Sequence, residues 1–197
     1  MKFMRALSFI FVISLVTLLL TAFGGDPETG KALGLKRQAK LSAFKAMNPT
    51  MLNWPELMPD NYFPEPQLFV FEFGAKSDLM AKALKTTPVV DDLGGQEISL
   101  AGYVVPLAGD ENAITEFLFV PNFGACIHVP PPPANQMIYV VPKYPLPYDE
   151  SWDPIVVNGT LQAEGATSEY GAAGYVMNDA ILTPYDADDM QQRQELH

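Results

Sequence analysis

The chain has 197 residues, a net charge of −11 and a hydrophobic content of 48%, which suffices for one domain with a hydrophobic core and flanking segments. The charge is unevenly divided, because residues 1–47 carry seven Lys or Arg against two acids (+5), whereas residues 48–197 carry five against 21 (−16). Such an acidic body has no basic groove for a phosphate backbone, so nucleic-acid binding is excluded.

The first residues have the pattern of a secretory signal. Lys2 and Arg5 precede an apolar run over residues 7–22, and the small residue Gly24 follows, as at a signal cleavage site. The run is short for a membrane span. We therefore expect residues 1–24 to be a signal peptide, or else an uncleaved anchor. Either arrangement predicts a periplasmic protein, which is soluble after cleavage or tethered by the anchor.

Residues 25–66 are predicted to form a basic helix and a proline-rich connector. Over residues 31–47, five Lys or Arg alternate with apolar residues in the pattern of an amphipathic helix. This helix is expected to cover part of the domain or to rest on an anionic membrane surface, which attracts basic residues by about 1 kcal/mol each. Five prolines between residues 48 and 66 predict an irregular connector, which Trp54 and Leu57 attach to the domain.

Residues 67–186 are predicted to form a β-barrel domain with a leading helix over residues 78–85. Alternating apolar residues predict five strands, at 97–107, 115–121, 137–141, 155–161 and 174–182. The fold class is therefore mainly β, with flanking helices around a small closed five-stranded Greek-key barrel of the oligonucleotide/oligosaccharide-binding (OB) type. A β-sandwich is the alternative. Gly102 and Gly159 are expected at bends or bulges, and residues 187–197 as a flexible acidic tail.

The most distinctive segment is FGACIHVPPPPANQ, residues 123–136. It contains the only cysteine, Cys126, and one of two histidines, His128, so no internal disulfide is possible. Side chains two residues apart on an extended segment point the same way, and one metal ion could therefore contact both. Zinc accepts a thiolate and an imidazole and takes about four ligands. Copper(I) is the alternative metal.

Further metal ligands would have to come from elsewhere in the chain. The candidate carboxylates and, for copper, the candidate thioethers are Asp91, Asp92, Glu116, Asp149 and Asp179, and Met137 and Met177. Methionine in a barrel core more often fills a gap than binds a metal. The sequence does not choose among these residues.

Two other interpretations of the segment remain open. Cys126 can be a small buried apolar residue, with His128 bonded to a nearby carbonyl group. A thiol beside an imidazole can also be an activated nucleophile, but no third group that would orient His128 is evident, and we do not expect an enzyme.

The neighbouring residues of the segment suggest a binding surface. Phe123 and the four prolines that follow His128, namely Pro130, Pro131, Pro132 and Pro133, could form a preformed polyproline II docking surface. The same prolines can instead be a rigid connector that blocks pairing at a sheet edge. Asn135 and Gln136 either contact the ligand or tie the loop to the barrel.

Several segments carry a resemblance to a known family. GYVVPL, TEFLFVPNFGACIHVPPPPANQ and IVVNGTL, with NWPELMP upstream, are similar to the exported bacterial family called domain of unknown function 3299. The likeness covers residues 53–185. Phe23 stands where the lipoprotein form of this family would have a lipidated cysteine. The resemblance implies a supporting role in envelope metal handling beside an ABC transporter, and no defined chemistry.

We therefore expect an exported accessory protein of an envelope transport system that binds zinc through the Cys-x-His loop. The first alternative is a metal-free interaction module that docks on the external domain of a transporter. The second alternative is a thiol-dependent enzyme.

Overall fold

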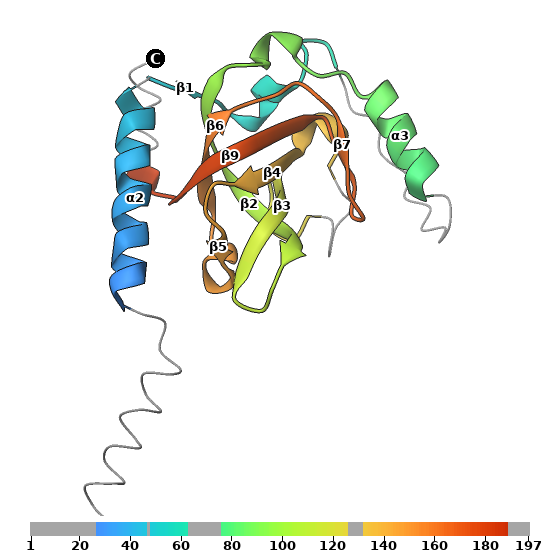
Figure 1. Ribbon diagram of the computed structural model, residues 1–197. Coiled ribbons are helices and arrows are strands. Elements are labelled where there is room, and N and C mark those ends of the chain that lie inside the picture. The colour runs from blue at the N-terminus through green and yellow to red at the C-terminus, as the bar shows by residue number, and fades with distance from the viewer. Residues whose placement is uncertain (1–26, 47, 63–75, 126–131, 189–197) are drawn as a thin grey trace, which may run out of the picture. The chain divides into compact units, whose positions relative to one another are not determined.

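The computed structural model describes residues 27–46, 48–62, 76–125 and 132–188 (Figure 1). The predicted signal peptide and most of the predicted tail lie outside these residues. So do four residues of the predicted site, which are Cys126, His128, Pro130 and Pro131. The chain divides into two compact units, residues 1–43 and residues 44–197.

The first unit contains most of helix α2 (Pro27–Ala46), which corresponds to the basic helix expected over residues 31–47. Lys31, Lys36 and Lys40 are exposed on it. No helix among the described residues is both long enough and apolar enough to cross a membrane.

The second unit is built around a closed barrel of five strands. They are β2 (Glu97–Gly109), β3 (Ala113–Val120), β4 (Ile138–Pro142), β6 (Ile155–Thr160) and β9 (Tyr175–Pro184). Neighbours follow the order β2-β6-β9-β4-β3, and β3 pairs again with β2 to close the barrel. All neighbouring pairs are antiparallel except β4 and β9. This Greek-key order confirms the predicted OB-like barrel, and the alternative β-sandwich was wrong.

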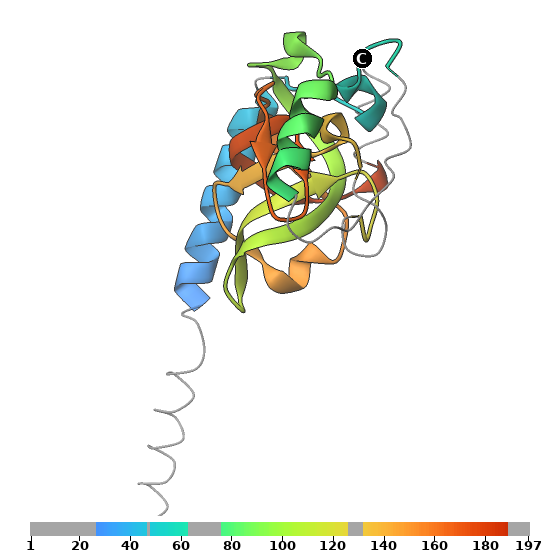
Figure 2. The same cartoon turned by 90° about the vertical axis from the view of Figure 1, so that its right-hand side faces the viewer.

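Shorter elements flank the barrel. They are β1 (Thr50–Met51), β5 (Leu146–Pro147), the hairpin of β7 (Ala166–Thr167) and β8 (Ala172–Ala173), the 3-10 helices η1 (Trp54–Leu57), η2 (Asp91–Leu93), η3 (Ala134–Gln136) and η4 (Tyr148–Ser151), and helix α3 (Lys76–Thr86). Helix α3 lies against the β7–β8 hairpin (Figure 2). The side chain of Leu84 there occupies the space beside Gly165.

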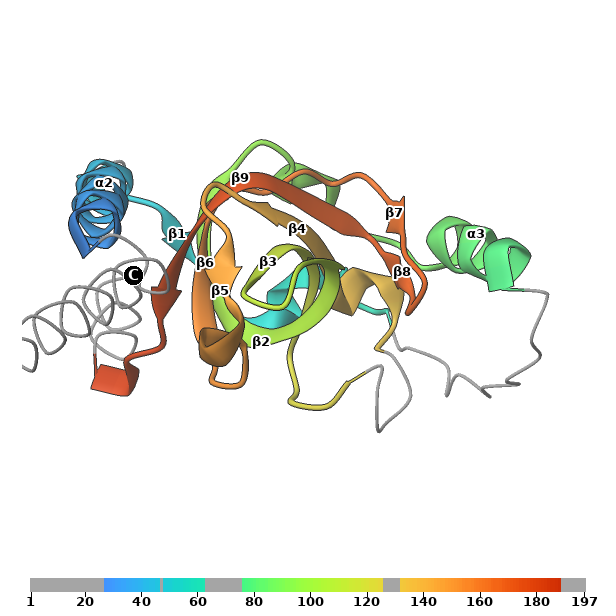
Figure 3. The ribbon, with the colours of Figure 1, turned by 60° about the horizontal axis from the view of Figure 1, so that its bottom comes forward.

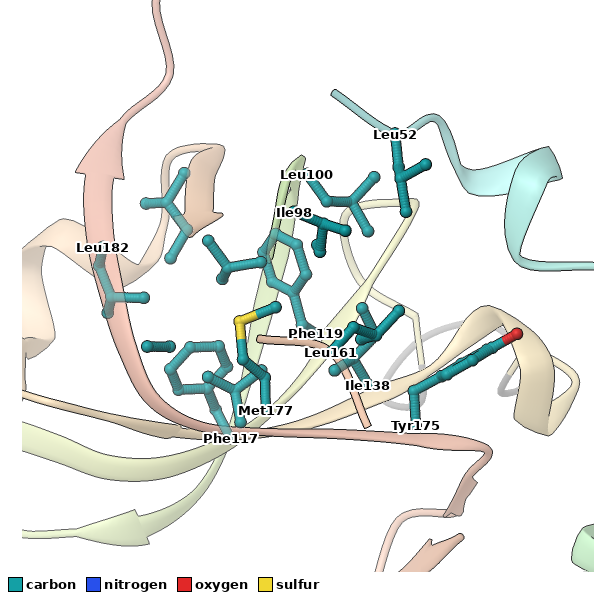
Figure 4. Packing of buried hydrophobic residues seen from close by; sticks show 14 of the residues in the cluster. Leu52, Ile98, Leu100, Phe117, Phe119, Ile138, Leu161, Tyr175, Met177 and Leu182 are labelled. Atoms are coloured by element: carbon teal, nitrogen blue, oxygen red, sulfur yellow. The ribbon is translucent and has the colours of Figure 1, made fainter. Parts of the chain in front are cut away.

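The barrel interior is filled by every second residue of each strand, as the pleat of a β-strand requires. On β3, for example, Phe117 and Phe119 point inward and are fully buried, and Ile138 and Val140 do so on β4. Figure 4 shows Phe117, Phe119 and Ile138 together with Met177 of β9. A second group, which we call the outer cluster, lies on the other face of β2, β3 and β4. It consists of Val105, Leu118, Val120, Ala125, Met137 and Ala173.

The two interior glycines have different roles. Gly102 is the last residue of β2 that pairs with β6, and from Tyr103 onward β2 pairs with β3. A Cβ atom on Gly102 would lie 2.7 Å from the Val120 carbonyl oxygen. Glycine therefore permits close contact between β2 and β3 where β2 changes its partner. The β2–β6 ladder continues through Gly159 without a register shift, so of the two expected features, a bend or a bulge, the bulge is absent from this ladder.

The register shifts lie elsewhere in the barrel. Two adjacent shifts fall between Pro106 and Gly109 of β2. Another lies in the β4–β9 ladder around Asp179, a non-glycine residue with a positive φ of 55°. Bulges of this kind bend and twist a strand, and β2 curls strongly around the barrel in Figure 3.

Candidate functional site

The predicted site lies in the loop that joins β3 to β4, and the first end of this loop is fixed on the barrel. Ala125 is buried in the outer cluster, with 1% of its surface exposed. Gly124 has a positive φ of 75°, a conformation that glycine adopts without strain. Phe123 remains 61% exposed, and its ring meets the ring of Tyr103 edge to face at 5.9 Å.

The second end of the loop is fixed by the two amide side chains. Asn135 and Gln136 lie in η3 and are both buried. The Asn135 Nδ2 donates a hydrogen bond to the Pro88 carbonyl oxygen at 2.8 Å, and the Gln136 Nε2 donates one to the Trp54 carbonyl oxygen at 2.7 Å. These bonds support the interpretation that Asn135 and Gln136 tie the loop to the domain. Pro132 and Pro133, just before η3, are partly exposed.

Sequence analysis missed a third member of this arrangement. Tyr175 on β9 is fully buried; its hydroxyl donates to the Leu57 carbonyl oxygen at 2.8 Å and accepts from the Val90 N–H at 2.7 Å. Burial raises the pKa of the Tyr175 hydroxyl, although the hydrogen bond from Val90 opposes this effect. We call the side chains of Asn135, Gln136 and Tyr175 the polar lock.

The polar lock has one unsatisfied atom and borders a groove. Among the described residues, the buried Asn135 Oδ1 has no hydrogen-bond partner. Val90, whose N–H donates to the Tyr175 hydroxyl, also lines an open groove of about 510 Å³. The other residues that line this groove are Pro55, Glu56, Met58, Pro59, Asp60 and Val89. The connector around η1 therefore forms one wall of a concave surface that borders the polar lock at Val90.

The candidate metal ligands are dispersed. Within the described part of the chain, no three His, Cys, Asp or Glu side chains are grouped so that they could hold a metal ion. Asp179 pairs with Lys143 at 2.9 Å, and Asp91 and Asp92 begin η2 while Asp149 lies in η4. Cys126 and His128 themselves lie outside the described residues.

The two candidate thioethers lie in separate hydrophobic clusters. Met177 is in the barrel interior beside Gly159, and Met137 is in the outer cluster. Both side chains are nearly fully buried and fill space as core residues.

Glu116 has a different partner. It accepts a hydrogen bond from the Tyr139 hydroxyl on the neighbouring strand. This bond, with burial and the negative charge of Glu116, raises the pKa of Tyr139 to about 12. Both side chains are partly buried, so Glu116 has a structural partner in the described domain.

Comparison with known proteins identifies relatives. Residues 54–184 match the family described as protein of unknown function (DUF3299). The fold is similar to the crystal structure, at 2.45 Å resolution, of a DUF3299 family protein from Pseudomonas aeruginosa PAO1. That protein is 40% identical, with a TM-score of 0.57, and the match covers 70% of this chain and 97% of the other. No curated protein matches this chain.

Proposed function

This chain belongs to the DUF3299 family, and from that premise we propose that it is an exported, non-enzymatic accessory protein of an envelope transport system. In this proposal the loop that contains Cys126 and His128 binds zinc. The transport role follows from the family resemblance seen in the sequence, and the zinc site follows from the residue types in the loop.

The observation that supports the proposal most directly is the attachment of the loop at both ends. Ala125 is buried in the outer cluster, and Asn135 and Gln136 are hydrogen-bonded to the connector. A short segment with fixed ends has fewer conformations to lose when it binds a ligand. Residues 126–131 lie between these ends and bring a thiolate and an imidazole, which zinc prefers.

Zinc is favoured over copper(I) because the two candidate methionine ligands are packed in hydrophobic clusters. Copper(I) selects soft ligands such as thiolate and thioether sulfur, but Met137 and Met177 serve as core residues in separate clusters. The remaining ligands for zinc would be carboxylates or water.

Metal analysis of the purified protein tests the proposal. We expect about one zinc ion per chain, lost in Cys126→Ser and in His128→Ala. His197→Ala should retain the ion, because ordering a chain end is entropically costly. Zinc affinity should fall as the pH drops through the histidine range, since protons compete for both ligands. Unchanged zinc content in both loop variants, or no zinc in the parent protein, would refute the site.

A metal-free docking module is the second candidate, and the exposure of Phe123 favours it. A large aromatic side chain that is exposed yet fixed against Tyr103 is typical of an interface anchor. In this case Phe123→Ala should weaken binding to the external domain of the transporter at least tenfold. Chelators should leave that binding unchanged. If the chelator alone abolishes it, docking depends on the metal and the metal-free alternative is wrong.

A further inference from the structure

The domain has a second exposed surface, which is separate in sequence from the loop between β3 and β4. It is formed by η4 and the two residues after it, and consists of Tyr148, Asp149, Glu150, Trp152 and Asp153. We call it the aromatic–acidic patch. Trp152 is 60% exposed and Tyr148 is 41% exposed, and their rings meet edge to face at 6.1 Å. Two exposed aromatic side chains in contact form a contiguous apolar surface, which is more informative than a single exposed ring.

The patch is held rigidly. The preceding strand β5 pairs with β3 (Figure 3), with Leu146 opposite Ile114 in the core. The Tyr148 N–H donates to the Asn112 carbonyl oxygen at 2.9 Å, and the Ser151 hydroxyl donates to the Tyr148 carbonyl oxygen at 2.7 Å. The aromatic rings are therefore presented by a fixed backbone, which lowers the entropic cost of binding.

The charge of the patch is uncompensated. Asp149, Glu150 and Asp153 are exposed, and none of the three has an ion-pair partner among the described residues. The stretch from residue 87 to residue 188 contains a single Lys or Arg, Lys143, against fourteen Asp or Glu. Lys143 is itself paired with Asp179. Among the described residues of this stretch, no unpaired Lys or Arg therefore accompanies the patch.

Aromatic faces and carboxylates together match one kind of partner. A guanidinium or ammonium group is attracted to the face of a Trp or Tyr ring and to nearby carboxylates at the same time. An anionic lipid surface would instead be repelled. We propose that the aromatic–acidic patch is a docking surface for a polypeptide segment of a partner protein that carries Arg or Lys side chains.

Binding of a hexaarginine peptide to the purified protein, measured by calorimetry at low salt, tests this proposal. Trp152→Ala should weaken binding about two- to fivefold, the loss expected for one exposed cation–π contact. Trp152→Leu keeps the apolar bulk but has no ring face, so it should weaken binding equally. The triple variant Asp149→Asn/Glu150→Gln/Asp153→Asn should lose more affinity at low salt than at high salt.

Matched controls separate the patch from the general acidity of the domain. Tyr170→Ala removes another exposed aromatic side chain outside the patch, and the triple variant Asp92→Asn/Glu164→Gln/Glu169→Gln removes three exposed acids elsewhere. Both should leave the affinity within about twofold of the parent. Equal losses of affinity in the patch variants and the control variants would overturn the proposal. The peptide would then be attracted by the overall negative charge of the domain and not by the patch.

Two further results would also overturn it. Self-association that Trp152→Ala abolishes would make the occupant a second copy of this chain, whose basic helix could then reach the patch. Binding to phosphatidylcholine vesicles that depends on Trp152 would make the patch a lipid-contacting surface. We expect the protein to neither self-associate nor bind these vesicles through Trp152.

Discussion

The Tyr175 hydroxyl donates a hydrogen bond to the carbonyl oxygen of Leu57, 118 residues earlier in the chain, at 2.8 Å. The Tyr175 hydroxyl oxygen in turn accepts a hydrogen bond from the Val90 N–H at 2.7 Å. One side chain on the last barrel strand thus joins the connector around η1 to the segment before η2. Figure 4 shows Tyr175 at the edge of the interior cluster, with its hydroxyl oxygen pointing away from the other labelled side chains.

Tyr175→Phe should therefore destabilise the domain. The change leaves the Leu57 carbonyl and the Val90 N–H without their partner in a buried position, which costs about 1–3 kcal/mol. Urea unfolding followed by circular dichroism would measure the loss. Tyr185→Phe is the control, because Tyr185 is 42% exposed and should change stability by less than about 0.5 kcal/mol. Equal stability of the two variants would contradict the assigned role of the hydroxyl.

Gly102→Ala should be more destabilising than Gly159→Ala. A Cβ at position 102 would lie 2.7 Å from a backbone oxygen of Val120, which cannot move without disturbing the β2–β3 ladder. Overpacking of this kind costs about 1–3 kcal/mol. At position 159 the nearest atom is the flexible Met177 sulfur, at 3.1 Å. Comparison of the two urea midpoints tests the ranking, and the reverse order would contradict it.

Asn135→Asp should destabilise the domain in a pH-dependent way. The variant places a carboxyl group at a fully buried position and, when ionised, removes the donor to the Pro88 carbonyl. At neutral pH we expect a loss of roughly 3 kcal/mol or more.

Burial should raise the pKa of that carboxyl in the folded state above its unfolded value. The deficit should therefore be small below the unfolded pKa and grow as the pH rises through the folded one. Urea midpoints at pH 4 and pH 7.5 measure this difference. The exposed Asn122→Asp is the control and should show no such trend, and a deficit in Asn135→Asp that is independent of pH would contradict burial of the amide.

The Tyr139 hydroxyl should lose its proton at a higher pH than an ordinary tyrosine does. Its hydrogen bond to Glu116 raises its pKa to about 12, above the usual value near 10. The folded state therefore holds the phenolic proton more tightly than the unfolded state does. The resulting stability is fully present below pH 10 and is lost between about pH 10 and pH 12. Glu116→Gln should lower the Tyr139 pKa, which ultraviolet titration of the tyrosines would detect; Tyr139→Phe identifies the signal.

Much of the barrel could be predicted from the sequence, because alternation of apolar residues has the period of a strand. Each of the five main strands begins and ends within two residues of its expected position. What alternation does not reveal is the place of register shifts. The shift at Asp179 depends on a non-glycine residue with positive φ. That backbone conformation cannot be recognised from the pattern of hydrophobic residues.

Less of the candidate site than of the barrel could be predicted from the sequence. The roles of Asn135 and Gln136 are set by backbone carbonyls of Pro88 and Trp54, which are 47 and 82 residues away in the chain. Tyr175 was overlooked because a tyrosine in a strand is usually an ordinary packing residue. A buried phenol needs a hydrogen-bond partner, and this requirement is the one signal that could have marked it.

The basic helix allows a test of membrane contact. Lys36 and Lys40 are exposed on α2, and each basic residue near an anionic surface contributes about 1 kcal/mol of attraction. Protein that begins after residue 24 should bind vesicles with anionic lipid at low salt and dissociate as ionic strength rises. Lys36→Glu/Lys40→Glu should weaken this binding at least tenfold in a vesicle sedimentation assay. The same charge change at the exposed Lys82 and Lys85 of α3 should have much less effect. Equal binding to neutral vesicles, or none to either kind, would show that α2 does not contact the membrane surface.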